Sequence, residues 1–135
     1  MFKLVKILGG RINQAEPRRI RVQEVEEDIS AGTPISIINS HVTVIRDDET
    51  NPVTHILEAD VSYGEHYVTV IDVLPGMVFS APIVGAPSNI SVGVEYMIKE
   101  GGLSGYSAPA RGAGGVCFED PEATDTEVLM TFRGA

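Results

Sequence analysis

The chain has 135 residues, of which 43% are hydrophobic, and its 10 Lys and Arg against 19 Asp and Glu give a formal net charge of −9. This length predicts one domain that is large enough to bury a hydrophobic core. No apolar run approaches the roughly 18 residues of a membrane span, which argues against a membrane protein. The acidic total argues against a nucleic-acid partner, and the single cysteine excludes an internal disulfide.

The basic residues are concentrated at the start of the chain. Residues 1–21 hold six of them beside one acid, which gives this segment about +5 and leaves about −14 for residues 22–135. The six are Lys3, Lys6, Arg11, Arg18, Arg19 and Arg21. We expect an extended N-terminal arm that docks either on the acidic body of its own chain or on a separate acidic partner. The start has no small-residue cleavage site, so we expect cytoplasmic synthesis without a signal peptide.

Short segments rich in Val, Ile, Thr and aromatic residues follow along the chain, each bounded by turn residues. They predict strands at 2–8, 34–38, 42–46, 53–58, 67–73, 77–81, 90–98, 115–118 and 127–132. Residues 18–29 fit neither a helical nor a strand period throughout, and we expect a loop or an extended connector there. About nine short strands predict an all-β fold with at most one short helix, as a single compact β-sandwich or small barrel.

Three local patterns give sharper predictions. Asn39-Ser40 lies between two apolar runs and predicts a tight hairpin. The apolar segments 70–73 and 78–81 flank a Pro-Gly turn and predict a second hairpin, whose two strands pair with each other. Residues 90–98 alternate, so that Ile90, Val92, Val94, Tyr96 and Ile98 are expected on one face of a strand.

The stretch 101–115, GGLSGYSAPARGAGG, holds six glycines in fifteen residues. We expect a mobile surface loop, and because structureless loops of this length are uncommon in compact domains, the segment either contacts a partner or is disordered alone. Leu103, Tyr106 and Arg111 are its candidate contact residues. The sequence therefore predicts an N-terminal arm, residues 1–21, followed by a β-rich body, residues 22–135, that contains this loop.

No catalytic or metal-binding pattern emerges from the sequence. Ser104 has glycines at the wrong offsets for a nucleophile elbow, and Cys117 is expected to be a buried, inert thiol. The three histidines are scattered, so no zinc site is predicted. A weak calcium site stays open at residues 47–49 or at Glu119-Asp120 with Asp125. We expect no cofactor, no catalytic residue and no enzymatic activity.

Several segments together resemble the small head decoration proteins of tailed bacteriophages, which are similar in plan to the lambda-type head-stabilising proteins. They are MFKLVKILGGRINQAEP, AGTPISI, ILEADV, YVTVIDVLPGMVFSAPI, SVGVEYMI and EVLMTFR. The resemblance implies a virion structural protein, made in the host cytoplasm, that binds the outside of the capsid lattice and stabilises the head. It also implies the major capsid protein as partner and a homo-oligomer, with a trimer favoured, and no direct contact with nucleic acid or membrane.

The resemblance gives the arm residues a role in the lattice contact. Phe2, Leu4, Val5 and Ile7 are expected to add a strand to a neighbouring sheet edge, while Lys3, Lys6, Arg11, Arg18 and Arg19 meet acidic capsid surface. Three alternatives stay open: another virion or tail component, a β-sandwich module that binds carbohydrate or protein, and a small trimeric nucleotide hydrolase. The last is suggested because residues 111–115, RGAGG, resemble the glycine motif of trimeric dUTPases, although no other motif of that family is found.

Overall fold

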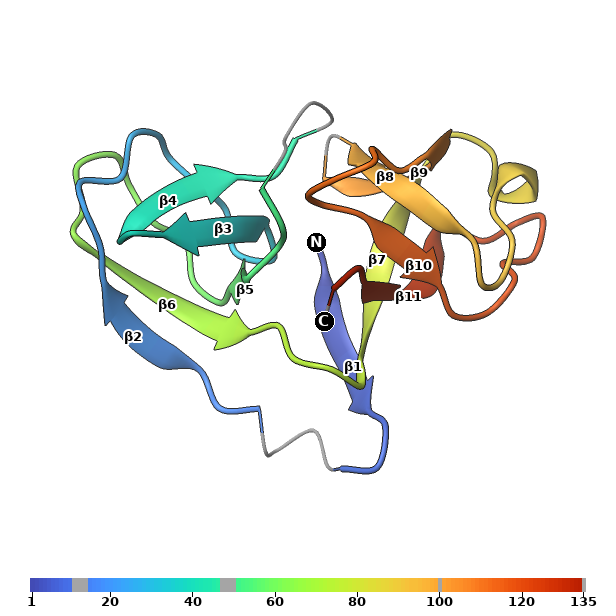
Figure 1. Ribbon diagram of the computed structural model, residues 1–135, viewed down its shortest axis with the longest axis horizontal. Coiled ribbons are helices and arrows are strands. Elements are labelled where there is room, and N and C mark those ends of the chain that lie inside the picture. Colours follow the sequence, from blue (N-terminus) through green and yellow to red (C-terminus); the bar gives the residue numbers. More distant parts are fainter. Residues whose placement is uncertain (11–14, 47–50, 100, 135) are drawn as a thin grey trace.

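The computed structural model describes residues 1–10, 15–46, 51–99 and 101–134, and these residues form two β-sheets that lie side by side (Figure 1). No α-helix occurs among them, and one short 3-10 turn, η2 (Pro87–Asn89), is the only helical element in the described part of the chain. None of these residues forms a helix long and apolar enough to cross a membrane. The prediction of an all-β fold is confirmed.

The first sheet closes into a small barrel. Its strands are β1 (Lys3–Ile7), β7 (Met77–Val84), β8 (Glu95–Lys99), β9 (Gly102–Ser107), β10 (Gly115–Cys117) and β11 (Glu127–Phe132). They lie in the order β1-β7-β11-β10-β8-β9, and an added parallel pairing of β7 with β9 closes the ring. Because β1 pairs with residues 77–80 of β7 and β9 pairs with residues 83–84, the two strands share one side of β7. β1 is therefore an extra strand attached to a five-stranded barrel.

The second sheet is fully antiparallel and lies to the left of the barrel in Figure 1. It contains β2 (Arg18–Arg21), β3 (Pro34–Ile38), β4 (His41–Val44), β5 (His55–Leu57) and β6 (Tyr67–Asp72), in the order β2-β6-β5-β3-β4. The turn between β3 and β4 has Asn39 and Ser40 at φ 52° and 63°. Two successive positive φ angles fit a type I′ turn, so the predicted Asn39-Ser40 hairpin is confirmed.

Two groups of buried apolar side chains stabilise the fold. One lies under the second sheet and consists of Val22, Val25, Ile29, Ile35, Leu57, Val61, Val68 and Val70. The other fills the barrel, around Phe79 and Met130, and also includes Ile45, Val53 and Ile56 from the chain around β5. Since this second group takes side chains from both halves, it joins the two sheets into one packed body.

The predicted hairpin, in which residues 70–73 pair with residues 78–81, is wrong. β6 pairs with β2 and β5, whereas β7 pairs with β1, β9 and β11, so the Leu74–Met77 turn passes the chain from one sheet to the other. Both segments are apolar enough to be strands, and pairing elsewhere buries them more fully than a two-stranded hairpin does. Phe79 and Val78 are wholly buried in the structure.

The predicted strand at residues 90–98 is only half correct. Strand β8 begins at Glu95, and a turn comes before it, in which the Val94 N–H donates to the carbonyl of Ser91 at 3.3 Å. Gly93 adopts φ 78° in this turn, a conformation that disfavours residues with a side chain. Val92 and Val94 are therefore exposed at 53% and 45%, although the alternation placed them with the buried Tyr96 and Ile98.

The glycine-rich segment is not a mobile loop over its first half. Residues 102–107 form β9, which pairs with both β7 and β8 and completes the barrel. A Cβ atom on Gly102 would come within 2.6 Å of the Pro82 carbonyl oxygen, and one on Gly115 within 2.7 Å of the Leu103 side chain. These glycines allow close packing of neighbouring strands, which is a different use from loop flexibility.

Candidate functional site

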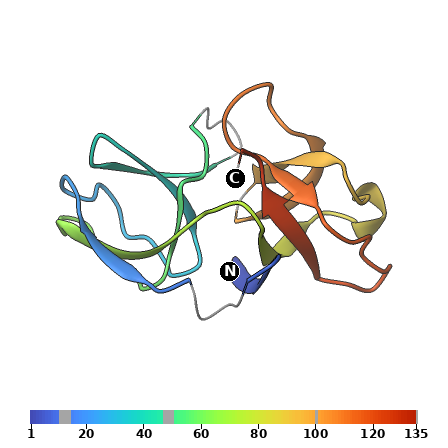
Figure 2. The same ribbon diagram turned by 60° about the horizontal axis from the view of Figure 1, so that its bottom comes forward.

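Strand β2 forms an open, basic edge of the second sheet. Its sequence is Arg-Arg-Ile-Arg, and within the described residues it pairs only with β6. Arg18, Arg19 and Arg21 are exposed, while Ile20 is half-buried over the apolar cluster of its sheet. In Figures 1 and 2 the strand lies on the outer rim of its sheet, away from the barrel. Three exposed cations in a strand of four residues make this edge a candidate contact for an acidic partner.

Arg18 is held by an ion pair on the neighbouring strand. Its Nε and Nη2 atoms donate to Asp72 Oδ1 at 3.1 Å and 3.0 Å. The same oxygen accepts from Nε2 of His55 on β5 at 2.9 Å. Since Arg18, Asp72 and His55 come from three adjacent strands, the contact fixes the first residue of β2 on the sheet. Arg18 is therefore less available to a partner than its exposure suggests.

Arg19 and Arg21 carry no carboxylate partner in the described part of the chain. The Arg19 guanidinium lies over the ring of Tyr67 on β6, with its Cζ 4.0 Å from the ring centroid. Such stacking orients the planar guanidinium and leaves its N–H groups free for an anion. Tyr67 is itself 40% exposed. The side chains of Arg19, Arg21 and Tyr67 therefore form an exposed cationic and aromatic surface beside the open edge.

His55 lies in a polar network with Thr54 and Asp72. Its Nδ1 is 2.7 Å from Thr54 Oγ1, which also accepts the N–H of Ile37 at 2.8 Å, and its Nε2 contacts Asp72. These bonds are all satisfied when Nε2 carries the proton and the Thr54 hydroxyl donates to Nδ1. Burial lowers the pKa of His55 below its ordinary 6.5; the charge of Asp72 opposes this change and Arg18 adds to it. The ring is therefore neutral near pH 7 and serves as a structural link.

Strand β1 carries the other predicted contact residues, and the structure divides them between surface and core. Phe2 and Leu4 are 2% and 8% exposed and belong to the barrel core, so their predicted contact with a partner is wrong. Lys3, Val5 and Lys6 are exposed, and Ile7 is half-buried against the core. The Lys6 ammonium lies 4.7 Å from the ring centroid of Phe118. Pairing with β7 turns Leu4 toward the core and, after a bulge between Leu4 and Lys6, Ile7 as well, and this bulge is not readable from the sequence.

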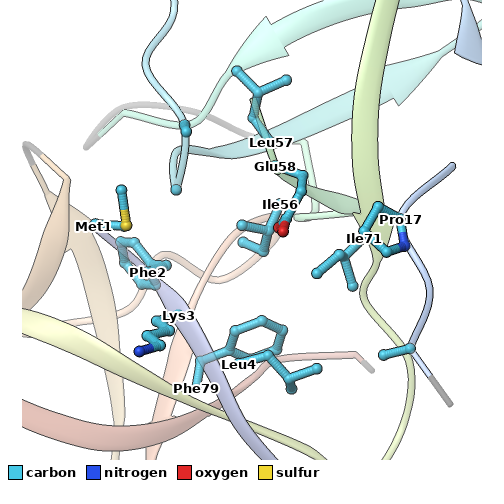
Figure 3. A pocket seen from close by; sticks show the side chains of 13 residues that line it. Met1, Phe2, Lys3, Leu4, Pro17, Ile56, Leu57, Glu58, Ile71 and Phe79 are labelled. Atoms are coloured by element: carbon cyan, nitrogen blue, oxygen red, sulfur yellow. The ribbon is translucent and has the colours of Figure 1, made fainter. Parts of the chain in front are cut away.

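A pocket of about 420 Å³ lies between the two sheets. Figure 3 shows Phe2, Leu4 and Phe79 of the barrel on one side, with Ile56 and Ile71 of the second sheet across from them. Its lining is mainly apolar, with Lys3 and Glu58 as its charged members. No pair of these groups is arranged for acid–base or nucleophilic chemistry, and the pocket reads as imperfect packing where the two sheets meet.

The predicted contact residues of the glycine-rich segment are also divided. Leu103 is wholly buried in the barrel core, so its predicted surface contact is wrong. Tyr106 is 66% exposed, with the Lys99 ammonium 5.2 Å from its ring centroid, and Arg111 is exposed. This segment belongs to the barrel, whereas β2 belongs to the second sheet, so the predicted sites do not converge. Arg11 lies outside the described residues, as does the acidic turn at residues 47–49.

The remaining candidates for chemistry have structural partners. Cys117 is 2% exposed, and its Sγ lies 2.9 Å from the carbonyl oxygen of Glu119; burial raises the pKa of this thiol. Asp120 accepts the N–H of Val92 at 2.6 Å, and Asp125 accepts that of Glu122 at 2.8 Å, so both act as turn-stabilising acids. In the described ranges no group of three or more His, Cys, Asp or Glu is placed to hold a metal ion.

Sequence reasoning did not assign Arg21, Tyr67 and Asp72 to the β2 surface. Residues 18–21 have three charges in four positions, and the sequence predicts a loop or an extended connector there. Tyr67 and Asp72 lie about fifty residues further along the chain, and only the antiparallel register of β2 on β6 brings them beside Arg19 and Arg18. One signal for a strand was available: Ile20 lies between Arg19 and Arg21, which is the polar–apolar alternation of a half-buried strand.

Comparisons with known proteins give no match, either to a family model or to a curated protein. A function for this chain is therefore proposed from its own residues and surfaces.

Proposed function

We propose that this protein is a structural component of a tailed-bacteriophage virion that binds the exterior of the capsid lattice and stabilises the head. Its partner in this proposal is the major capsid protein, and its location is the capsid surface. The resemblance of its sequence segments to head decoration proteins suggests the class. The observation that carries the proposal is the open edge of β2, where Arg19 and Arg21 are exposed and have no acidic partner among the described residues.

An edge strand suits this task because it offers main-chain donors and acceptors along a line, together with side chains of one charge sign. Main-chain pairing gives affinity, and charge selects an acidic surface over a basic one. The chain as a whole carries −9, so the basic edge differs sharply from the rest of its surface. That contrast orients the protein as it approaches a larger acidic assembly.

The proposal assigns no chemical step to the protein. The side chains that come nearest to a catalytic arrangement are Thr54, His55 and Asp72. Both ring nitrogens of His55 already have partners within the fold, and the Thr54 hydroxyl accepts a main-chain N–H. The proposal gives this network a structural role, as a link between the strands β5, β6 and β2.

The test is co-sedimentation of the purified protein with capsids that lack their decoration protein. We expect binding that weakens as salt rises, because exposed charges are screened. A variant with Arg19→Glu and Arg21→Glu should lose most of its affinity. Lys3→Glu with Lys6→Glu, at the lysines of β1 that are also expected to meet acidic capsid surface, should lose less, because the proposal depends on β2. Absence of co-sedimentation at every salt concentration would overturn the proposal.

The oligomeric state forms a separate part of the proposal. The resemblance favours a homo-oligomer, and among closed assemblies a trimer. Light scattering after gel filtration, on samples that contain no capsids, measures the mass of the protein in solution. A monomer that also occupies isolated positions on the lattice, as seen by electron microscopy, would remove the trimer and leave capsid binding in place.

A further inference from the structure

The open side of β2 presents a defined set of main-chain groups. Val22, just after the strand, donates its N–H to the carbonyl of His66 at 2.8 Å. Hydrogen-bonded pairs alternate with non-hydrogen-bonded pairs along an antiparallel ladder. Counting back from Val22 in the register of β2 on β6, Ile20 and Arg18 bond to β6, and Arg19 and Arg21 do not. The N–H and C=O groups of Arg19 and Arg21 therefore point away from β6, toward the open edge.

The side chains beside these groups are divided between two faces. Arg19 and Arg21 share the face that carries Tyr67 and Thr69, their direct neighbours on β6. Ile20 lies on the opposite face with Val68, where it packs on the buried cluster of the second sheet. Residues two apart on a strand are about 7 Å apart, so the two guanidinium groups form a pair of cationic positions at the spacing of alternate residues on an incoming strand.

We propose that β2 is a strand-addition site for an extended peptide segment with the alternating pattern acidic–apolar–acidic. The segment extends the second sheet by one strand, through the main-chain groups of Arg19 and Arg21. Its two acidic side chains lie opposite Arg19 and Arg21, and its central apolar side chain packs beside Ile20. The inference deepens the proposed function and rests on it only for the identity of the chain that supplies the segment.

Charge complementarity selects this occupant over the other candidates for an open edge. A second copy pairing through its own β2 would place arginines opposite arginines, and like charges directly opposite each other destabilise a strand pair. A neutral or basic strand gains the same main-chain bonds, but it brings no negative charge to Arg19 and Arg21. An acidic carboxylate instead accepts two parallel N–H bonds from a guanidinium, and the ring of Tyr67 already orients that of Arg19.

The test uses the full-length protein and short blocked peptides, with no capsid present. The probe peptide alternates glutamate and valine and is expected to pair antiparallel to β2. One control replaces each glutamate by lysine, and a second N-methylates the main-chain nitrogens of the glutamates, which removes the donors to the Arg19 and Arg21 carbonyls and keeps the charges. Titration is followed by the amide NMR signals of the protein. We expect the glutamate peptide to shift the amides of Arg19 and Arg21 first and to protect them from hydrogen exchange, while both controls bind at least about tenfold more weakly.

Matched protein variants separate β2 from the other edge strand. Arg19→Glu with Arg21→Glu should weaken the glutamate peptide by about tenfold or more and strengthen the lysine peptide. Lys3→Glu with Lys6→Glu changes the same number of charges on β1 and should leave the affinity within about twofold. All four side chains are exposed, and a urea unfolding curve for each variant confirms that it folds.

Three outcomes would overturn the inference. The lysine peptide binds as well as the glutamate peptide; the shifts fall on β1 or on the pocket between the sheets; or the protein alone self-associates through β2 in sedimentation velocity. The fate of the proposed function is separate. Peptide binding without capsid binding removes the capsid proposal and keeps the strand-addition site, whereas capsid binding without peptide binding does the reverse.

Discussion

Phe2→Ala tests whether the first residues of the chain belong to the core. The Phe2 side chain is 2% exposed, and its ring centroid lies 5.6 Å from that of Phe132, which in turn contacts Phe79 at 5.0 Å. Removing a fully buried Phe costs about 3–5 kcal/mol, as the sum of lost burial and the cavity left behind. Because Phe2 also lines the pocket between the sheets, where water can replace the ring, we expect the lower end, about 3 kcal/mol.

The assay is urea unfolding of the wild type and the variant at the same temperature and pH, with the free energy of unfolding taken from each curve. Val5→Ala on the same strand is the control, since Val5 is 41% exposed and should change stability by less than about 0.5 kcal/mol. A Phe2→Ala variant within about 1 kcal/mol of wild type would refute the reasoning. Residues 1–10 would then lie outside the core, as part of an arm separate from the body.

Three further outcomes are expected. Gly102→Ala should destabilise the protein by about 1–3 kcal/mol in urea unfolding, because the new Cβ meets the Pro82 carbonyl oxygen where β9 closes the barrel; Ser107→Ala on the same strand should be nearly neutral. The unfolding free energy should decline as the pH falls below about 6.5, because the pKa of His55 is lower in the folded state than in the unfolded chain, so that the unfolded chain takes up the proton first. The His55→Gln variant should lessen this decline, and a variant with the same pH profile as the wild type would contradict the assignment. Cys117 should react with a thiol reagent only slowly until urea unfolds the protein, because burial raises its pKa and blocks access; fast labelling of native protein would show that β10 opens readily.

The separate status of the arm is where sequence and structure differ most. Residues 1–21 stand out by charge, which suggests a segment that works apart from the body. The structure instead places β1 against β7 and β2 against β6, so that the segment adds an edge strand to each sheet. Charge is a property of the exposed side chains, and edge strands carry charge for the same reason that flexible arms do: one side of each remains in water.

The glycine-rich stretch shows a second limit of sequence reasoning. Six glycines in fifteen residues are typical of a flexible loop, yet the first half of β9 lies in the interior, with Gly102, Leu103 and Ser104 all buried. Because glycine has no side chain, a glycine-rich sequence is usually taken to indicate a flexible backbone. In this protein it allows two neighbouring backbones to come close, and only the packed structure distinguishes the two uses.

Local patterns determined the all-β class, most of the strands and the Asn39-Ser40 turn, because period-two alternation and turn preferences act over a few neighbouring residues. Tertiary structure alone decided which strands pair, and with that the open edge of β2 and the placement of Tyr67 and Asp72 beside its arginines. Strand pairing depends on contacts between residues far apart in the chain. An apolar strand such as β7 is compatible with several partners until the whole core is assembled.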